Sequence, residues 1–247
     1  MKRFLAALIF FTRLPFWRIA QPPAECYKRV VDYWSAIGWL TGGVTALVLA
    51  LTAWIFPPTV AVIIAFASRL LLTGALHEDG MADFFDGMGG GTSRERILAI
   101  MKDSHIGTYG VIGLIVYYLL VVSLISSLPV MVACLVIFAG DTWSKFCASQ
   151  IINFLPYARK ENEAKNHTVY SGMSTVTWLV SFLFGALPLY LLPRNYLFAA
   201  ICPMVVSMTL IVLMRRKLQG YTGDCCGATF LLSELSFYLG IVAIQGI

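Results

Sequence analysis

Four carboxylates lie within the short stretch HEDGMADFFDG, residues 77–87, of a chain that is otherwise strongly apolar. Only 13% of the residues are charged, whereas 59% are hydrophobic. Carboxylates that share a helix face repel one another. A divalent cation reverses that repulsion, and Mg²⁺ commonly bridges carboxylates to the phosphates of a substrate. The stretch therefore predicts a magnesium site for a phosphorylated substrate, with a solvated acidic helix face as the alternative.

The spacing of three of these carboxylates places them on one face of a helix. If a helix continues from the preceding apolar stretch through residue 87, Asp79, Asp83 and Asp86 stand at positions i, i+4 and i+7. We expect these three aspartates to be the metal ligands and to belong to the catalytic residues. Zinc fits less well, because Met81 occupies the second histidine position of an HExxH motif. The aspartate spacing also differs from that of a calcium EF-hand.

A glycine-rich segment with basic residues follows, GMGGGTSRERILAIMKDSHIGTYG, residues 87–110. Thr92 with Glu95 predicts a capping box that opens a short helix. Backbone N–H groups at such a start can hold an anion, and basic side chains can add bonds to phosphate oxygens. We assign three basic residues to substrate binding, Arg94, Arg96 and Lys102, with a flexible hinge that carries solvated arginines as the alternative. Asp103 is a candidate ligand or base, with a surface charge at the helix end as the alternative.

Charged residues also occur at the ends of apolar stretches and within them. Asp224, in the motif GYTGDCCGA, is either a functional carboxylate or the N-cap of the last apolar segment. Asp141, Lys145 and Glu234 lie inside apolar segments, where a charge is a functional candidate by default. Asp141 and Lys145 are one helical turn apart and could simply pair. Arg69 could face the carboxylates or a lipid phosphate.

Several apolar stretches are long enough to cross a bilayer, for which about 18 to 20 residues suffice. The mean hydropathy is +0.78, and the runs are continuous rather than alternating, which disfavours a β-barrel. Basic residues concentrate before the first span and in alternate connections, so we expect a cytoplasmic N-terminus and an external C-terminus. We predict an all-α, polytopic membrane bundle of about seven transmembrane helices, over residues 35–56, 58–77, 108–128, 130–152, 172–192, 195–214 and 225–246.

A single membrane-embedded domain is expected to cover residues 1–247. Residues 1–30 predict an amphipathic interfacial segment rather than a cleaved signal peptide. Residues 78–107 form the predicted active-site segment, and the 153–171 and 215–224 loops are expected to meet it on the cytoplasmic face. The six cysteines are interpreted as small buried hydrophobes rather than as disulfides or a zinc site. The chain has no nucleophile elbow, P-loop or nucleic-acid module, so no nucleic-acid partner is expected.

Four motifs together resemble the cobalamin synthase family, the adenosylcobinamide-GDP ribazoletransferases: FFTRLP near the N-terminus, HEDGMADFFDG, IMKDSHIGTYG and GYTGDCCGA. The resemblance covers nearly the whole chain. It implies a multi-pass enzyme of the bacterial inner membrane, with its active site facing the cytoplasm. Such an enzyme joins α-ribazole, or its 5′-phosphate, to adenosylcobinamide-GDP and releases GMP, with Mg²⁺ as cofactor. The product is adenosylcobalamin or its phosphate, which makes this a late nucleotide-loop step of coenzyme B12 biosynthesis.

The resemblance also assigns residues, position by position. It places Asp79, Asp83 and Asp86 in the acidic motif, Asp103 in the second motif, Asp224 in the third, and Arg13 as a phosphate-binding arginine in the first. This chain departs from the family pattern at three places. Glu78 stands at an often apolar position and is not counted as a ligand, and Lys145 stands where arginine is expected. The loop 157–165 keeps its first three residues but lacks the expected glycine-containing continuation.

Two other functions are compatible with an acidic motif beside membrane spans. A CDP-alcohol phosphotransferase performs related chemistry on lipids, but its motif D-x-x-D-G-x-x-A-R has arginine after the alanine, where this chain has Asp83 after Ala82. A divalent-cation transporter would also place acidic residues near spans. In that case the arginines of the glycine-rich segment would have no evident purpose. The lipid bilayer is an expected partner, and the sequence leaves a homo-oligomer open.

Overall fold

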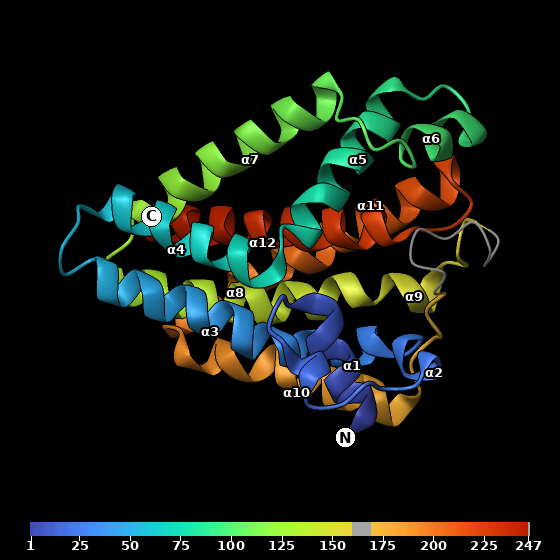
Figure 1. Ribbon diagram of the computed structural model, residues 1–247. Helices are drawn as coiled ribbons and strands as arrows, with labels where there is room; N and C mark the ends of the chain where they lie inside the picture. Colours follow the sequence, from blue (N-terminus) through green and yellow to red (C-terminus); the bar gives the residue numbers. More distant parts are fainter. Residues whose placement is uncertain (160–168, 247) are drawn as a thin grey trace.

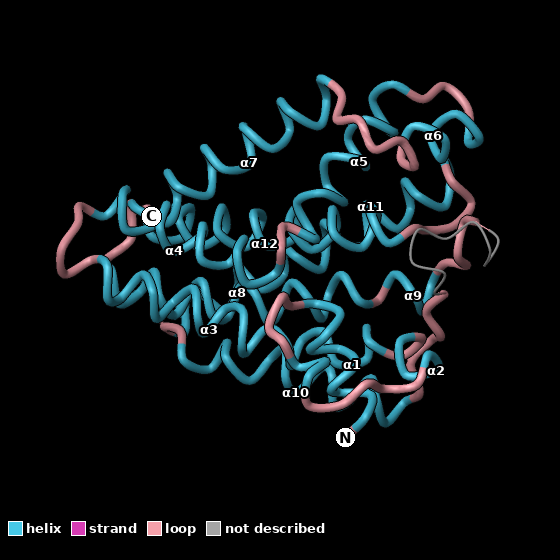
Figure 2. Tube along the Cα trace, in the orientation of Figure 1, coloured by secondary structure: helices cyan, strands magenta, loops and turns pink. Residues whose placement is uncertain are grey.

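The computed structural model describes residues 1–159 and 169–246, and this part of the chain is built from helices without strands (Figures 1 and 2). One isolated β-bridge joins Tyr157 to Tyr221. The elements are, in chain order, α1 (Lys2–Phe11), η1 (Phe16–Arg18), α2 (Ala24–Tyr27), η2 (Val30–Tyr33), α3 (Trp34–Thr52), α4 (Pro58–Thr73), α5 (Leu76–Gly90), α6 (Arg94–Ile100), α7 (Thr108–Ser126), α8 (Val130–Ser149), α9 (Ile151–Phe154), α10 (Thr175–Ala186), η4 (Leu187–Leu191), η5 (Arg194–Ala200), α11 (Ile201–Lys217) and α12 (Gly223–Gln245).

The length and composition of these helices confirm a polytopic all-α membrane bundle. Among the described residues, five helical segments are long and apolar enough to cross a membrane: Val30–Thr52, Thr108–Ser126, Val130–Phe154, Arg194–Lys217 and Gly223–Gln245. The pair α4 and α5 passes the same test only as one bent unit, and Thr175–Leu191 is a shorter apolar helix. The predicted count of seven spans is therefore not confirmed, because two of the seven are broken or short.

The second predicted span does not continue as one helix through residue 87. α4 ends at Thr73, α5 begins at Leu76, and the two helices are bent by 92°. Gly74 and Ala75 both adopt the left-handed conformation, with φ of 68° and 56°, and left-handed residues terminate helices. The aspartate-bearing helix α5 therefore departs from the direction of α4 and runs toward α6 (Figure 1).

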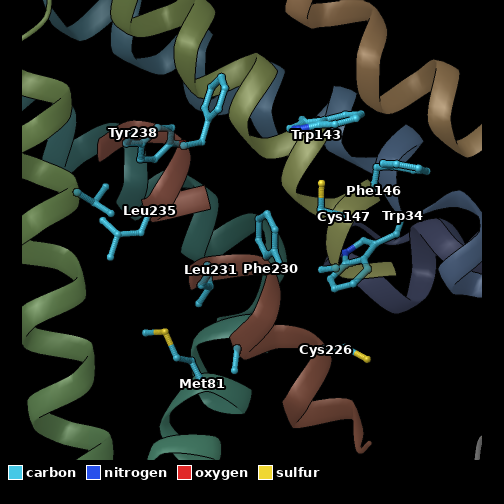
Figure 3. Packing of buried hydrophobic residues seen from close by; sticks show 14 of the residues in the cluster. Trp34, Met81, Trp143, Phe146, Cys147, Cys226, Phe230, Leu231, Leu235 and Tyr238 are labelled. Carbon is cyan, nitrogen blue, oxygen red and sulfur yellow. The ribbon is translucent and has the colours of Figure 1, made fainter. Parts of the chain in front are cut away.

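Helix α12 lies at the centre of the hydrophobic core. Figure 3 shows its Phe230 and Leu231, both fully buried, with Trp34 from α3 and Met81 from α5 on either side. Large apolar side chains are instead exposed along α7, α10 and α11, including Ile112, Ile115, Leu119, Leu179, Leu183, Val205 and Met208. Exposed apolar faces of this kind are expected where a helix faces lipid. The described cysteines, which are all six in the chain, are free, as expected.

A buried network of ion pairs links four helices in the interior. Arg69 of α4 lies 2.6 Å from Glu234 of α12, 3.8 Å from Asp141 of α8 and 4.0 Å from Glu78 of α5. Lys145 pairs with Asp141 one turn away, which confirms that expectation. Four hydroxyl groups donate to the carboxylates of the network: those of Tyr117, Tyr238, Tyr118 and Thr41. Mutual pairing is the arrangement that buried charges require, so these residues hold the helices together.

The polar connections expected to meet do so at one end of the bundle. Arg94 of α6 donates to the carbonyl oxygens of Leu218 and Ala158, each at 2.7 Å. The backbone N–H of Ala158 donates to Tyr221 O at 2.8 Å. The C-terminus lies at the other end (Figure 1). The remainder of the predicted 153–171 loop, residues 160–168, lies outside the described residues.

Candidate active site

A cavity of about 150 Å³ lies where α1, α3, α5 and the start of α12 meet. Two carboxylates line it, Asp79 of α5 and Asp224 of α12, and the guanidinium-bearing Arg159 lies in its wall. Asp79 is exposed, whereas Asp224 keeps only 8% of its surface accessible. The cavity therefore combines acidic and basic groups at the end of the bundle where the polar connections meet.

Close packing of two helices brings these carboxylates to one cavity. A Cβ added to Gly80 of α5 would lie 2.9 Å from Asp224 Cα, and one added to Gly227 of α12 would lie 2.9 Å from His77 O. Each glycine thus faces the backbone of the other helix, and only a hydrogen atom fits between them. The glycine within the acidic motif is what allows Asp79 and Asp224 to line the same space.

The sequence left open whether Asp224 is the N-cap of the last apolar segment, and the structure shows that it is not. The N-cap is Thr222, whose Oγ1 accepts a hydrogen bond from Cys225 N at 3.4 Å. Asp224 lies within the first helical turn, where a negative charge is favoured by the helix dipole. Its Oδ2 also accepts from Thr222 Oγ1 at 3.3 Å. The cap therefore does not require the Asp224 carboxylate.

The three aspartates of the acidic motif have different surroundings. Both oxygens of Asp86 accept backbone N–H groups at the start of α7, from Gly107 at 2.7 Å and from Gly110 at 2.9 Å. Asp83 is buried, with 9% of its surface accessible, one turn after Asp79. Among the residues that the structure describes, no group of three or more His, Cys, Asp or Glu side chains is placed to hold a metal ion.

This arrangement fits an ion that is completed by substrate. Mg²⁺ usually takes one or two carboxylates and fills its remaining positions with waters and substrate phosphates, rather than with an all-protein cage. Asp79 and Asp224 supply such a pair in the cavity, and Asp83 lies on the adjoining turn of α5. Asp86 is the least suited of the three aspartates, because both of its oxygens already accept backbone donors. The magnesium assignment stays a prediction.

A second, more open pocket of about 400 Å³ gathers basic side chains. It is lined by Arg94 and Lys102, as the sequence predicts, and by Arg159, which also lines the cavity with the carboxylates. The Arg94 guanidinium is partly committed to Leu218 O and Ala158 O. Arg159 thus joins the acidic cavity to a basic pocket large enough for a phosphate group.

Three predicted site residues line a third pocket, of about 370 Å³, on the other side of α6: Asp86, Arg96 and Asp103. The N-cap of α6 is Ser93, which accepts from Arg96 N at 3.2 Å, so the predicted Thr92 capping box is not formed. Asp103 is exposed and lies 2.7 Å from His105 Nδ1. The hydrogen bond from the His105 side chain lowers the pKa of Asp103.

Arg13 is not among the residues that line these three pockets. Its backbone N–H donates to Leu72 O at 2.7 Å, and its side chain crosses Gly74, where an added Cβ would lie 2.1 Å from Arg13 Nε. Arg13 therefore lies at the junction of α4 and α5. Its predicted phosphate contact stays untested.

Sequence reasoning missed the aromatic side of the first cavity. Trp34, His77 and Tyr157 line it with the carboxylates. Burial raises the pKa of Tyr157 to about 12, so its hydroxyl stays protonated and can donate. His77 is the first residue of HEDGMADFFDG, and this position next to the carboxylates was the available signal in the sequence. No spacing pattern connects Trp34 or Tyr157 to the carboxylates, since they come from distant parts of the chain.

Comparison with known proteins identifies the family. The family model described as cobalamin-5-phosphate synthase matches residues 3–242. An adenosylcobinamide-GDP ribazoletransferase of Shewanella woodyi is 36% identical over 98% of this chain and 96% of its own length. One of Vibrio parahaemolyticus is 36% identical over 98% and 92%, and one of Leptospira interrogans is 34% identical over 97% and 94%. No solved structure is significantly similar to the chain. A family match over nearly the full length, with relatives of this identity, shows that the chain belongs to the cobalamin-5-phosphate synthase family.

Proposed function

We propose that this chain is a Mg²⁺-dependent transferase that joins ribazole, or its 5′-phosphate, to adenosylcobinamide-GDP and releases GMP. The family and the names of its relatives place the chain at the late step that assembles the nucleotide loop of coenzyme B12. The observation that carries the proposal at the residue level is the cavity shared by Asp79, Asp224 and Arg159. An acidic pair beside a basic pocket is the arrangement that a diphosphate substrate with a metal ion requires.

The reaction makes one P–O bond and breaks another. A ribose hydroxyl of ribazole attacks the phosphorus next to the cobinamide, the bond from that phosphorus to the GMP oxygen breaks, and the hydroxyl loses its proton. Asp79, Asp83 and Asp224 are the residues that would hold Mg²⁺. The ion, when bound, would neutralise charge on the diphosphate.

The positions of the other polar residues indicate which of them would stabilise the leaving group and which would accept the proton. Arg159 donates to Leu98 O at 3.0 Å through Nη2. Lys102 and the uncommitted parts of Arg94 and Arg159 lie where they would stabilise the charge of the leaving GMP. The Asp224 oxygen that does not bind the ion is the better candidate for accepting the hydroxyl proton, because Asp224 lies in the cavity with Asp79, whereas Asp103 lies in another pocket. We also propose that this end of the bundle faces the cytoplasm from the bacterial inner membrane, as the basic connections predict.

The direct test is an assay of the purified chain in detergent with ribazole and adenosylcobinamide-GDP. We expect equal amounts of GMP and adenosylcobalamin, dependence on Mg²⁺, and loss of both products on addition of a chelator. Asp83→Asn and Asp79→Asn should each abolish turnover while the protein still inserts and purifies. Gly43→Ala is a matched control, because an added Cβ there meets no atom closer than 4.0 Å.

The same preparation separates the competing functions. CMP release from a CDP-activated lipid, with no GMP from the corrinoid donor, would identify a CDP-alcohol phosphotransferase. Divalent-cation flux into vesicles that contain neither donor would identify a transporter. Normal turnover in the Asp79→Asn and Asp83→Asn variants would refute the assigned metal ligands while leaving the reaction intact.

A further inference from the structure

Two buried polar atoms in the wall of the first cavity have no hydrogen-bond partner among the described residues. They are Trp34 Nε1 and His77 Nε2, on side chains with 1% and 4% of their surface accessible. A buried donor left unpaired loses its hydrogen bonds to water without replacement, so such groups usually have a partner. Both residues line the same cavity, and each of the two atoms has less than 1 Å² accessible, so a ligand in that cavity becomes the partner after a small turn of the side chain.

The walls of the cavity are flat and aromatic. The Phe11 and Trp34 rings stack at 5.4 Å with 7° between their planes, and the His77 ring lies 5.5 Å from that of Trp34. Phe10 and Tyr170 complete this side. Aromatic walls with a few placed polar groups are typical of sites for planar ring ligands. The carboxylates of Asp79 and Asp224 belong to the same cavity, so the ring would lie next to the proposed reaction site.

We infer that this cavity binds the benzimidazole ring of ribazole, with Trp34 Nε1–H donating to the one ring nitrogen that is not bonded to the ribose. The inference rests on the proposed function and names the part of the substrate that the site selects. Trp34 can only donate a hydrogen bond, and that ring nitrogen can only accept one. His77 Nε2 can donate or accept according to its tautomer, so it can serve the same nitrogen or a ribose hydroxyl.

The other two rings in the reaction fit the cavity less well. A corrin macrocycle is far larger than a space of about 150 Å³. Guanine would fit by size but carries several donors and acceptors along its edge, and each one left unpaired would weaken binding. Among the described residues, the aromatic side offers two buried groups without a partner, Trp34 Nε1 and His77 Nε2, besides the hydroxyl of Tyr157, and the carboxylates are assigned to the metal. The benzimidazole has one acceptor and two methyl groups, which matches an aromatic wall with one fixed donor.

The test compares Trp34→Phe, which keeps a ring and removes the donor, with Trp143→Phe. Trp143→Phe is the control for the loss of an indole donor, because Trp143 Nε1 donates to Ala200 O at 2.8 Å and Trp143 does not line the cavity. We expect Trp34→Phe to raise the KM for ribazole about 10-fold, the value of one hydrogen bond of about 1.4 kcal/mol. The KM for adenosylcobinamide-GDP and the kcat should stay unchanged, and Trp143→Phe should leave all three unchanged.

An analogue of ribazole with a ring C–H in place of the accepting nitrogen tests the same bond on the unmodified protein. The wild type should bind this indole riboside about 10-fold more weakly than ribazole, and Trp34→Phe should not distinguish the two ligands. If Trp34→Phe does not fold, the analogue comparison alone decides. Equal binding of both ribosides by the wild type, or a raised KM for adenosylcobinamide-GDP instead of ribazole in Trp34→Phe, would overturn the inference.

The failure of the proposed function has a different signature. In that case the wild type forms no adenosylcobalamin from any combination of substrates. Titration calorimetry with free 5,6-dimethylbenzimidazole, without adenosylcobinamide-GDP or metal, then still measures whether the cavity binds the ring. Binding that Trp34→Phe weakens supports the ring site, whereas no binding to the wild type overturns it.

Discussion

At the scale of single residues, two aspartates on the same helix have different surroundings. Asp79 lines the cavity and is exposed, whereas both oxygens of Asp86 accept N–H groups at the start of α7. A sequence pattern at i, i+4 and i+7 predicts that the aspartates share a helix face. It cannot show which of them is bonded to the protein backbone, because the partners of Asp86 are residues 107 and 110, outside the pattern. The structure therefore separates a candidate ligand from a residue that anchors the next helix.

Asp86→Asn is expected to act through stability. An asparagine keeps one accepting oxygen and turns an amide NH₂ toward the other backbone N–H, so one buried donor is left unpaired. We expect a loss of about 1–3 kcal/mol in the free energy of unfolding, with turnover reduced only in part. Thermal unfolding in detergent measures the first effect, and GMP release measures the second. Asp79→Asn should show the reverse, an unchanged melting temperature with no turnover, and a stable but inactive Asp86→Asn would contradict this assignment.

Asp103 is expected to be dispensable for the chemical step. The hydrogen bond from His105 lowers its pKa, so the carboxylate stays ionised well below neutral pH and is a weak base. It is also exposed and lies outside the cavity that holds Asp79 and Asp224. Asp103→Asn should therefore keep most of the wild-type kcat, with the same pH profile between neutral and mildly alkaline conditions. Loss of turnover in Asp103→Asn but not in Asp224→Asn would show that Asp103, rather than Asp224, accepts the hydroxyl proton.

At the scale of elements, the contact between α5 and α12 determines whether the cavity exists. Gly80→Ala and Gly227→Ala would each place a Cβ 2.9 Å from backbone atoms of the other helix, so the helices would have to separate. We expect each variant to lose at least 10-fold in kcat/KM and about 1–3 kcal/mol of stability, as overpacked sites typically do. Gly43→Ala, in open space on α3, should leave both unchanged. Wild-type kinetics in both α5–α12 variants would show that this contact does not position the site.

The sequence predicts most helices of the bundle but not how the aspartate helix is directed. Continuous apolar runs predict α3, α7, α8, α11 and α12, because the bilayer demands about 20 apolar residues per span. The break at Gly74 and Ala75 could not be predicted, since a left-handed alanine is unfavourable locally and depends on surrounding contacts. The motifs likewise predicted Asp79 and Asp224, whereas Trp34 and Arg159 join the site only through packing of distant segments.

At the scale of the whole molecule, the buried charges decide whether the bundle holds together. Arg69 contacts carboxylates on three helices, those of Glu78 on α5, Asp141 on α8 and Glu234 on α12. Arg69→Met would leave Glu234 as an unpaired buried charge, which typically costs about 3–5 kcal/mol. We expect a large drop in melting temperature and in membrane yield. The double variant Arg69→Met, Glu234→Met should recover part of this loss, and an equal or greater loss in the double variant would argue against a pairing role.

The number of times that the chain crosses the membrane follows from which ends of the bundle its termini occupy. Arg29 donates to Gly172 O at 2.9 Å and Ser171 N donates to Lys28 O at 3.0 Å, so the N-terminal segment lies beside the connection that precedes α10. The C-terminus lies at the far end from the polar connections (Figure 1). Termini on opposite sides require an odd number of crossings, as seven would give if the bent α4–α5 pair and the short α10–η4 helix each cross.

Reporter fusions at the two termini show whether the number of membrane crossings is odd or even. With basic connections retained in the cytoplasm, a C-terminal alkaline phosphatase should be active and a C-terminal green fluorescent protein dark, while the same fluorescent protein at the N-terminus should be bright. Each fusion must retain ribazole transfer, so that only correctly inserted protein is scored. A bright and active C-terminal fusion would mean an even number of crossings. The Thr175–Leu191 segment would then enter and leave on one side, because it is shorter than each of the five helical segments long enough to cross, and the C-terminus would share a compartment with the acidic motif.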